Sequence, residues 1–376
     1  MIALALTLLA GFISVYVATP YAKKYLLASG IYGIDQQKKD KPKIPTSGGI
    51  PVLFGFIFSI TLYMALTAIT GTQVNLTLLL AALSSANIIA LIGLIDDIHI
   101  DLEEIIRDET GDQKFELELK QKVGEIDTPH RAIHEKISVI TGNQETSEDI
   151  HRTGLGQKTK MLIVLPALLP LIAVGAGSWT MNIPIINYTI NWGIIYPLIL
   201  MPGGFLFVSN IVNMLAGTNG LSTSLTLITS TSIGIFALIN GRTEAAVIAL
   251  SLAATTLAFL KYNKYPASVL PGDSYTYLAG AALFSAIVIG NIELFGVSVF
   301  LIYLTEFILK ARSRFNAHSW GRLQQNGTLK TQHNKIYSLT HPLMNRGFTE
   351  KQITQVLAGT QTIWCILMLT FHILVI

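Results

Sequence analysis

The sequence predicts an all-α protein with ten membrane-spanning helices, and composition and apolar patterning carry that prediction. Of its 376 residues, 51% are hydrophobic and 13% are charged, whereas an ordinary soluble protein is roughly 25% charged. The mean hydropathy is +0.52, and the apolar residues gather into runs of about the 20 residues that cross a bilayer. These observations exclude a soluble globule and a disordered chain. Because Cys365 is the single cysteine, a disulfide-stapled secreted domain is excluded too.

Ten apolar runs are candidate spans. They cover about residues 1–21, 49–70, 76–95, 161–178, 193–212, 221–239, 244–260, 275–290, 294–309 and 357–376. The first run has no basic residue before it and ends at Lys23 and Lys24, which favours an uncleaved anchor over a signal peptide. We therefore expect the N-terminus outside, and ten spans place the C-terminus outside as well.

Basic residues lie almost entirely on one side of this topology. The internal loops fall near 22–48, 96–160, 213–220, 261–274 and 310–356, and they contain all but one of the 26 Lys and Arg residues, the exception being Arg242. Cytoplasmic loops carry such an excess. We therefore predict a multi-pass protein of the cell membrane with these loops in the cytoplasm, and the net charge of +3 is too small to indicate a nucleic-acid partner.

We predict one integral-membrane domain over 1–376 with two large cytoplasmic segments. Segment 99–157 contains 14 of the 23 acidic residues. Residues 115–120 alternate apolar and charged side chains, a strand pattern, and the apolar run 133–140 could pair with them as a β-hairpin. The segment is either this small inserted subdomain or a solvated acidic linker. The second large segment is the loop 310–356.

Acidic residues occur at two predicted cytoplasmic boundaries. Asp96 and Asp97 end the third apolar run, where both their mutual repulsion and the helix dipole disfavour negative charge. A positive partner should compensate them, either a basic side chain or a divalent cation. Asp273 lies in Pro-Gly-Asp-Ser at the start of the eighth run, where it fits a helix N-cap or, with the aspartate pair, a hard-oxygen site for Mg²⁺.

Amide side chains cluster after the fifth run. Asn210 and Asn213 are three residues apart and share a helix face. Gly217 and Gly220 interrupt the helix around Asn219 and leave backbone N–H groups for a phosphate or a base. Hydrogen bonding between helices with a glycine cap explains the same pattern.

Two basic segments complete the set. The loop 310–346 contains several arginines and histidines, and arginine forks suit diphosphate oxygens. Lys43 is one of four lysines that precede Gly48 and Gly49 at the entry to the second run. A basic approach of this kind suits an anionic headgroup, although attraction to anionic lipids explains it too. All five clusters face the predicted cytoplasm, whereas a transporter is expected to place polar groups at mid-bilayer.

Together these motifs resemble the polyprenyl-phosphate N-acetylhexosamine-1-phosphate transferase family. The resemblance covers essentially all ten spans, and about 99–154 falls outside it. The matching stretches are Gly-Leu-Ile-Asp-Asp at 93–97, Asn-Met-Leu-Ala-Gly-Thr-Asn-Gly-Leu at 213–221, the loop 262–274, and Arg312 to Arg322 with Gly327-Thr-Leu. The bacterial muramoyl-pentapeptide branch has a His-rich motif where this chain has Thr340-His341-Pro342. The pattern is therefore closer to the eukaryotic and archaeal branch that acts on UDP-N-acetylglucosamine and dolichyl phosphate, and we expect an archaeal member that serves protein glycosylation.

The resemblance implies a glycosyltransferase reaction in which a UDP-sugar donates its sugar 1-phosphate to a polyprenyl or dolichyl phosphate and releases UMP. Mg²⁺, or Mn²⁺ in its place, would be held by Asp273 and Asn213. Asp96 and Asp97 would position or deprotonate the attacking lipid phosphate, and which of them acts as a base stays open. Asn219 would contact uracil. The remaining predicted substrate contacts are Lys43, Lys160, Asn210, Arg312, Arg314, Arg322 and His341.

Three matters stay open at this stage. The donor could be another UDP-N-acetylhexosamine, such as a UDP-muramoyl-peptide. A nucleotide-sugar transporter would also explain the spans and a cytoplasmic sugar-nucleotide site, but it leaves the aspartate pair unexplained. A homodimer is a further expectation.

Overall fold

The computed structural model describes residues 1–98, 162–183 and 188–375. The predicted insertion 99–157, with its hairpin, and Lys160 lie outside the described residues. Within the described part the chain is mostly helical, as predicted. The helices that reach membrane-spanning length are α1 (Ile2–Ala28), α2 (Gly49–Thr70), α3 (Leu76–Asp97), η3 with α9 (Tyr196–Leu200 and Met201–Met214), α10 (Leu221–Ile239), α11 (Thr243–Asn263), α12 (Gly272–Gly290) and α16 (Glu350–Val375).

A ninth candidate span is broken. It consists of α13 (Glu293–Val299) and α14 (Leu301–Ala311), whose axes are bent by 63°. Two side chains of α16 bind carbonyls at the break: Gln361 Nε2 donates to Val299 O at 3.0 Å, and Trp364 Nε1 donates to Ser298 O at 2.7 Å. Backbone groups released inside a membrane need such partners, so α16 stabilises the bend.

The described short elements lie between the spans. They are η1 (Leu165–Leu168), α8 (Leu169–Ala173) and α15 (Thr340–Asn345), with three antiparallel hairpins: β1 (Tyr32–Ile34) with β2 (Lys43–Pro45), β3 (Thr180–Ile183) with β4 (Tyr188–Asn191), and β5 (Arg322–Leu323) with β6 (Leu329–Lys330).

Three predicted spans differ from the structure by more than one helical turn. The fourth, 161–178, has only η1 and α8 in its described part, because two prolines interrupt the hydrogen bonding and the chain turns at Gly175 and Gly177 with φ of +63° and +88°. The first runs on to Ala28. The last begins at Glu350 rather than 357, because Thr349 N–H donates to Gln352 Oε1 at 2.9 Å in a capping box that starts the helix before the apolar run.

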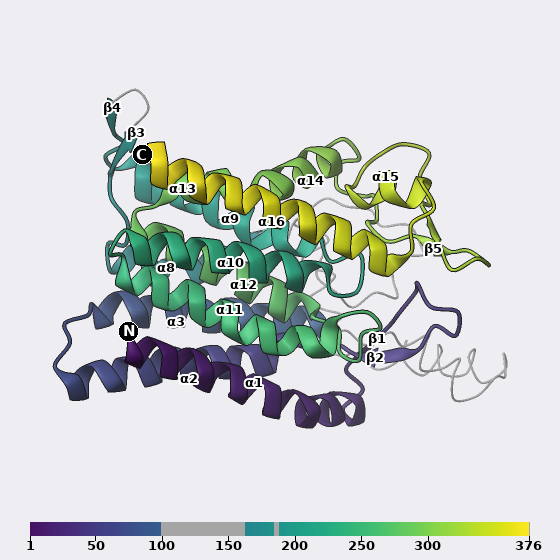
Figure 1. Cartoon of the computed structure of the whole chain (residues 1–376), viewed down its shortest axis with the longest axis horizontal. Coiled ribbons are helices and arrows are strands. Elements are labelled where there is room, and N and C mark those ends of the chain that lie inside the picture. Colours follow the sequence, from purple (N-terminus) through teal and green to yellow (C-terminus); the bar gives the residue numbers. More distant parts are fainter. Residues whose placement is uncertain (99–161, 184–187, 376) are drawn as a thin grey trace, which may run out of the picture. The chain divides into compact units, whose positions relative to one another are not determined.

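The loops gather at one end of the helices and the termini at the other (Figure 1). We call the first the loop end: it carries β1–β2, β5–β6, α15 and the turns 215–220 and 264–271. The N-terminus, the C-terminus and β3–β4 lie at the opposite end, which we call the terminus end. The described parts of the loops that the predicted topology assigns to one side therefore lie together.

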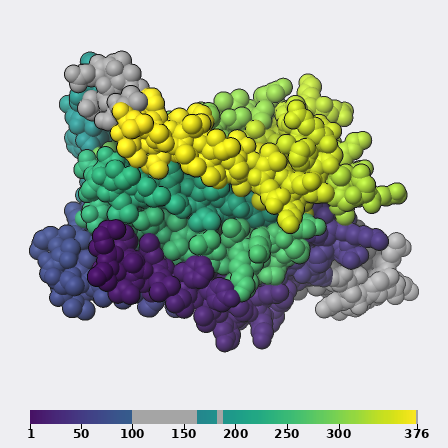
Figure 2. All heavy atoms as spheres, viewed as in Figure 1, coloured from purple at the N-terminus to yellow at the C-terminus, as the bar shows by residue number. Residues whose placement is uncertain are grey.

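Helix α12 lies at the centre and positions the site. It packs against α2, α3, α9 and α11. In its most apolar stretch of 18 residues 89% are buried, compared with 28% in α1 and 22% in α16. Figure 2 shows α1 and α16 running along the surface. Glycines allow the close contacts: a Cβ on Gly93 would lie 2.6 Å from the backbone of Asp273, and one on Gly280 would lie 2.5 Å from the Cα of Ser209. Small residues at crossings are typical of membrane helices.

Gly280→Ala should destabilise the contact between α9 and α12, because the added methyl group has no room. Overpacking of this kind costs about 1–3 kcal/mol, so the melting temperature in detergent should fall. Gly359→Ala is the matched control, since a Cβ there meets nothing within 4 Å and alanine favours a helix over glycine. Equal melting temperatures for the two variants would contradict the role given to Gly280.

Candidate active site

The carboxylate of Asp97 holds the beginning of α12. Its Oδ1 accepts the backbone N–H of Asp273 at 2.7 Å, and its Oδ2 accepts the N–H of Ser274 at 3.0 Å and the hydroxyl of Ser47 at 2.9 Å. The first N–H groups of a helix lack partners within the helix and form the positive end of its dipole. The positive partner that the sequence requires for Asp97 is therefore a helix N-terminus. Asp273 itself lies inside the first turn, so Asp97 provides the cap.

Glycines bring the chain segments before α2 and α12 together. Leu270 N–H donates to Pro45 O at 2.8 Å, and Gly48 N–H donates to Leu270 O at 3.0 Å. A Cβ on Gly48 would lie 2.8 Å from Leu270 O. Gly272 has φ +69°, and a Cβ there would lie 2.4 Å from an Asp97 oxygen. Gly48 and Gly272 therefore allow the two backbones to lie in contact, and this places Ser47 beside Asp97.

Tyr277 lies one turn along α12 from Asp273 and interacts with four of the predicted site residues. Its hydroxyl lies within electrostatic range of Asp273, Asp96 and Asp97, and it is a hydrogen-bonding partner of Asn213. Asp96 is 4% exposed, and both Asp96 and Asp273 interact with neighbouring groups. The ends of α3, α9 and α12 therefore contribute three carboxylates and one amide to a single region of the loop end.

This region has the oxygen chemistry of a magnesium site. Within the described ranges, no group of three or more His, Cys, Asp or Glu side chains is arranged to hold a metal. Mg²⁺ needs no such group, because it is commonly bound by one or two carboxylates with substrate phosphates and water. The oxygens of Asp97 already accept three hydrogen bonds, so Asp273 and Asn213 are the better candidates. The residues fit the ion.

Asn210 and Asn219 have different surroundings. Asn210 is buried, and its amide donates to Leu206 O at 2.9 Å within α9. The Asn219 amide donates to Asp35 Oδ2 at 2.9 Å, and its backbone N–H donates to Glu350 Oε1 at 2.8 Å. The structure therefore places Asn219 in a buried polar cluster that joins the α9–α10 turn to α16.

Lys38 neutralises part of this cluster. Its Nζ lies 3.1 Å from Asp35 Oδ2, and it also forms an ion pair with Glu350. Gln37 Nε2 donates to Gly217 O at 2.8 Å. The segment after β1 is therefore fastened to the same turn that carries Asn219.

The predicted basic contacts lie mainly on the surface of the loop end. Arg312, Arg314 and Arg322 are exposed, and Arg314 has a left-handed backbone with φ +53°. Lys43 is exposed too, and its Nζ lies 4.9 Å from the centre of the Tyr32 ring. These cations are accessible to an anionic ligand.

His341, by contrast, is fully buried in α15. Its Nδ1 accepts Tyr337 N–H at 3.3 Å, and its Nε2 lies 2.8 Å from His318 O. This arrangement requires the neutral tautomer with hydrogen on Nε2. Burial lowers the pKa of His341 below its ordinary value, and the nearby charges of His333 and Lys310 act in the same direction. The ring therefore supports the loop in its neutral form.

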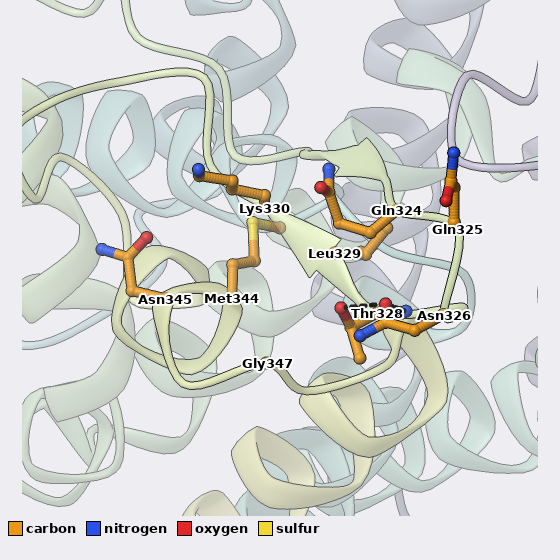
Figure 3. A pocket seen from close by; sticks show the side chains of 9 residues that line it. All are labelled: Gln324, Gln325, Asn326, Thr328, Leu329, Lys330, Met344, Asn345 and Gly347. Carbon is orange, nitrogen blue, oxygen red and sulfur yellow. Dashed lines mark hydrogen bonds between the residues drawn. The ribbon is translucent and has the colours of Figure 1, made fainter.

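An open pocket of about 560 Å³ lies on the outer part of the same loop. The residues that line it are Gln324, Gln325, Asn326, Thr328, Leu329, Lys330, Met344, Asn345 and Gly347 (Figure 3). None of these residues belongs to the acidic and amide region, so this pocket is separate in composition from the aspartates.

Sequence reasoning missed four polar residues that organise the loop end: Ser47, Asp35, Glu306 and Glu350. Glu306 and Glu350 fall in or beside long apolar helices, where a carboxylate is costly and indicates a partner. That signal was legible in the sequence. The partners of Asp35 and Ser47 come from distant segments, and local patterns carry no sign of them.

The chain is similar in sequence to several known proteins. Residues 140–291 match the sequence profile of glycosyl transferase family 4. A Saccharolobus solfataricus protein named as a UDP-N-acetylglucosamine–dolichyl-phosphate N-acetylglucosaminephosphotransferase is 30% identical over 370 residues, or 97% of this chain and 96% of that protein. A Sulfolobus acidocaldarius protein of the same name is 26% identical over 380 residues, or 99% and 97% of the two chains. A phospho-N-acetylmuramoyl-pentapeptide-transferase of Clostridium perfringens is 28% identical over 214 residues, or 56% and 63%.

The fold and the site define a multi-pass membrane protein whose acidic and amide residues converge at one end of its helices. The similarity along nearly the whole chain makes the identity specific: the chain belongs to the polyprenyl-phosphate N-acetylhexosamine-1-phosphate transferases of glycosyl transferase family 4. The resemblance drawn from the motifs is confirmed, including the archaeal branch.

Asp97→Asn should destabilise the protein without any ligand, because an amide offers a single acceptor oxygen to three donors. Hydrogen bonds to a charged group contribute about 1.5–3 kcal/mol, so the melting temperature measured with a chelator present should fall. Ser47→Ala should lower it less, since one hydroxyl is lost. The exposed Asp40→Asn is the control, and an Asp97→Asn protein as stable as that control would refute the cap.

His341→Gln should remove a pH dependence of stability. Because the folded-state pKa of His341 is lowered, its contribution is complete above the unfolded pKa and is lost as the pH falls through the folded pKa. The stability difference between wild type and His341→Gln should therefore shrink on going from about pH 7 to about pH 5. Thermal unfolding across this range measures it, and a constant difference would exclude a neutral buried ring.

Proposed function

We propose that this protein transfers N-acetylglucosamine 1-phosphate from UDP-N-acetylglucosamine to a dolichyl or polyprenyl phosphate. A lipid phosphate oxygen attacks the phosphorus attached to the sugar, the bond between the two phosphates of the donor breaks, and UMP leaves. The product is a lipid-diphosphate-sugar. Two observations support the proposal: the full-length similarity to proteins named for this reaction, and the convergence of Asp96, Asp97, Asp273 and Asn213.

The acidic and amide residues of the loop end would have separate roles in this reaction. Both reactants are anions, so catalysis of such a transfer is mainly positioning and electrostatic stabilisation. Asp273 and Asn213 would hold Mg²⁺, which supplies positive charge to the donor diphosphate when bound. Asp97 fixes the start of α12 and with it the direction of Asp273. We therefore assign the attacking lipid phosphate to Asp96, as the positioning or proton-accepting group.

The donor is held by the remaining polar groups. The exposed Arg312, Arg314 and Arg322, together with Lys160, would bind phosphate oxygens, and Lys43 would bind the lipid or sugar phosphate. Asn219 would contact uracil. Asn210 would support the donor site from within α9. The neutral His341 would act by supporting the loop that carries the arginines.

We also propose the orientation in the membrane. Residues 162–173 would belong to the fourth of ten spans, and the bent pair α13–α14 would form the ninth. Both termini lie at one end of the helices (Figure 1), as an even number of spans requires. The 26 Lys and Arg residues lie almost wholly in loops assigned to the opposite side, so we place the loop end and the active site in the cytoplasm.

A second donor class is a UDP-muramoyl-peptide, because the chain also resembles a phospho-N-acetylmuramoyl-pentapeptide-transferase. That resemblance covers 56% of the chain, compared with 97% for the first archaeal relative. The donor panel described below separates the two classes. It also separates both from a transporter, which would move the nucleotide sugar without forming UMP.

Purified protein with a polyprenyl phosphate should release UMP from UDP-N-acetylglucosamine in a Mg²⁺-dependent manner. Asp273→Asn should lower kcat by about two orders of magnitude, because removal of a group that stabilises developing charge costs this much. Asp40→Asn changes an exposed carboxylate at the same end and should leave the rate unchanged. UMP release is measured for a panel of UDP-sugars. No release from any of them would refute the transferase, and normal turnover by Asp273→Asn would remove Asp273 from the site.

A further inference from the structure

Glu306 of α14 is a fully buried carboxylate that takes no part in the proposed chemistry. It is 0% exposed, and its partners come from the loop that follows α14. Its Oε2 accepts Leu339 N–H at 2.8 Å and the Ser338 hydroxyl at 3.1 Å, and its Oε1 accepts the Ser319 hydroxyl at 3.4 Å. A buried charge is costly unless it is paired and hydrogen-bonded. Its bonds therefore hold both arms of the loop against α14.

Lys310 lies one turn further along and acts on the same loop. Its Nζ is 3.9 Å from Glu306 Oε1 and donates to Ala317 O. The two charges neutralise each other, so breaking the pair by removing one partner leaves the other buried and uncompensated. Between Lys310 and Ala317, Arg314 and Phe315 have left-handed backbones with φ of +53° and +65°. Such conformations persist in residues other than glycine only where the surroundings hold them.

Ser319 extends the contact to α9. Its hydroxyl has one proton, which is shared between Met214 O at 2.9 Å, at the end of α9, and Glu306 Oε1 at 3.4 Å. Its carbonyl accepts the Thr340 hydroxyl at 2.6 Å. A Cβ on Gly217 would lie 2.5 Å from the Ser319 Cβ, so the loop and the α9–α10 turn are in direct contact. Met214 follows Asn213, the proposed magnesium ligand, and the turn leads to Asn219.

We propose that Glu306 is a positioning residue. Through Ser319 it holds the arginine-bearing segment 312–322 at the end of α9. It thereby determines where the arginines lie relative to Asn213 and Asn219. The proposal rests on the proposed function, since it takes the segment and the turn as two halves of the donor site. It accounts for a fully buried carboxylate inside a candidate span. It also explains how exposed arginines on a strained turn acquire a defined place.

Glu306→Gln tests the proposal, because it keeps the shape of the side chain and removes the charge. We expect the KM for UDP-N-acetylglucosamine to rise about tenfold, the equivalent of one hydrogen bond to a charged group, with a smaller change in kcat. Amide hydrogen exchange should become faster in 313–322 and 337–341 and stay unchanged at the terminus end.

Ser319→Ala provides a second route if Glu306→Gln fails to fold, and it should change KM in the same direction. The double variant should be no worse than Glu306→Gln alone, because residues that act through one contact are not additive. Glu293→Gln is the matched control. Glu293 is also a carboxylate in the broken span and accepts the Tyr196 hydroxyl at 2.6 Å, but it lies in α13 and should leave KM unchanged.

Two results would overturn the proposal: faster exchange in the loop with an unchanged KM, or an equal rise in KM for Glu293→Gln. If the wild type releases no UMP from any donor, the proposed function fails by itself. UDP binding measured by calorimetry then decides the present inference. Weaker binding with faster loop exchange in Glu306→Gln supports it, and unchanged binding overturns it.

Discussion

The carboxylate of Asp97 at the start of α12 is the contact on which the loop end depends. A negative charge at the C-terminus of α3 is unfavourable by itself, and so are unpartnered N–H groups at the N-terminus of a buried helix. The Asp97 carboxylate accepts these N–H groups, so each compensates the other, and glycines let the backbones approach closely enough for this contact. Asp273 then projects from the first turn of a helix whose position is fixed by a residue 176 positions away in sequence. The position of Asp273 therefore depends on the contact between Asp97 and the start of α12.

A different balance of charge holds the outer part of the loop end. Lys38 pairs with Asp35 and Glu350, and Lys310 pairs with Glu306. These two lysines are paired internally, whereas Lys43 and the arginines at 312, 314 and 322 are exposed. This division matches the chemistry of the two side chains, because the guanidinium group binds phosphate oxygens in pairs. The loop end thus combines an acidic, amide-lined interior with a basic surface.

Sequence patterns predicted the helical class, the grouping of the loops and the convergence of Asp96, Asp97, Asp273 and Asn213. These follow from the cost of polar groups in a bilayer, which forces apolar runs and places charge at their ends. The same reasoning missed the capping box that starts α16 outside its apolar run, and the interrupted helix after residue 161. In both places local hydrogen bonding, or its loss at proline, outweighs hydropathy.

The sequence by itself determined that this chain crosses a membrane repeatedly and concentrates its polar residues at one end, because hydrophobicity and charge are local properties summed along the chain. Tertiary structure decided what each polar residue does. It made Asp97 a helix cap, engaged both ring nitrogens of His341, and linked Glu306 to the arginine loop. Such roles depend on contacts between distant segments, and packing in three dimensions, rather than spacing along the chain, selects those partners.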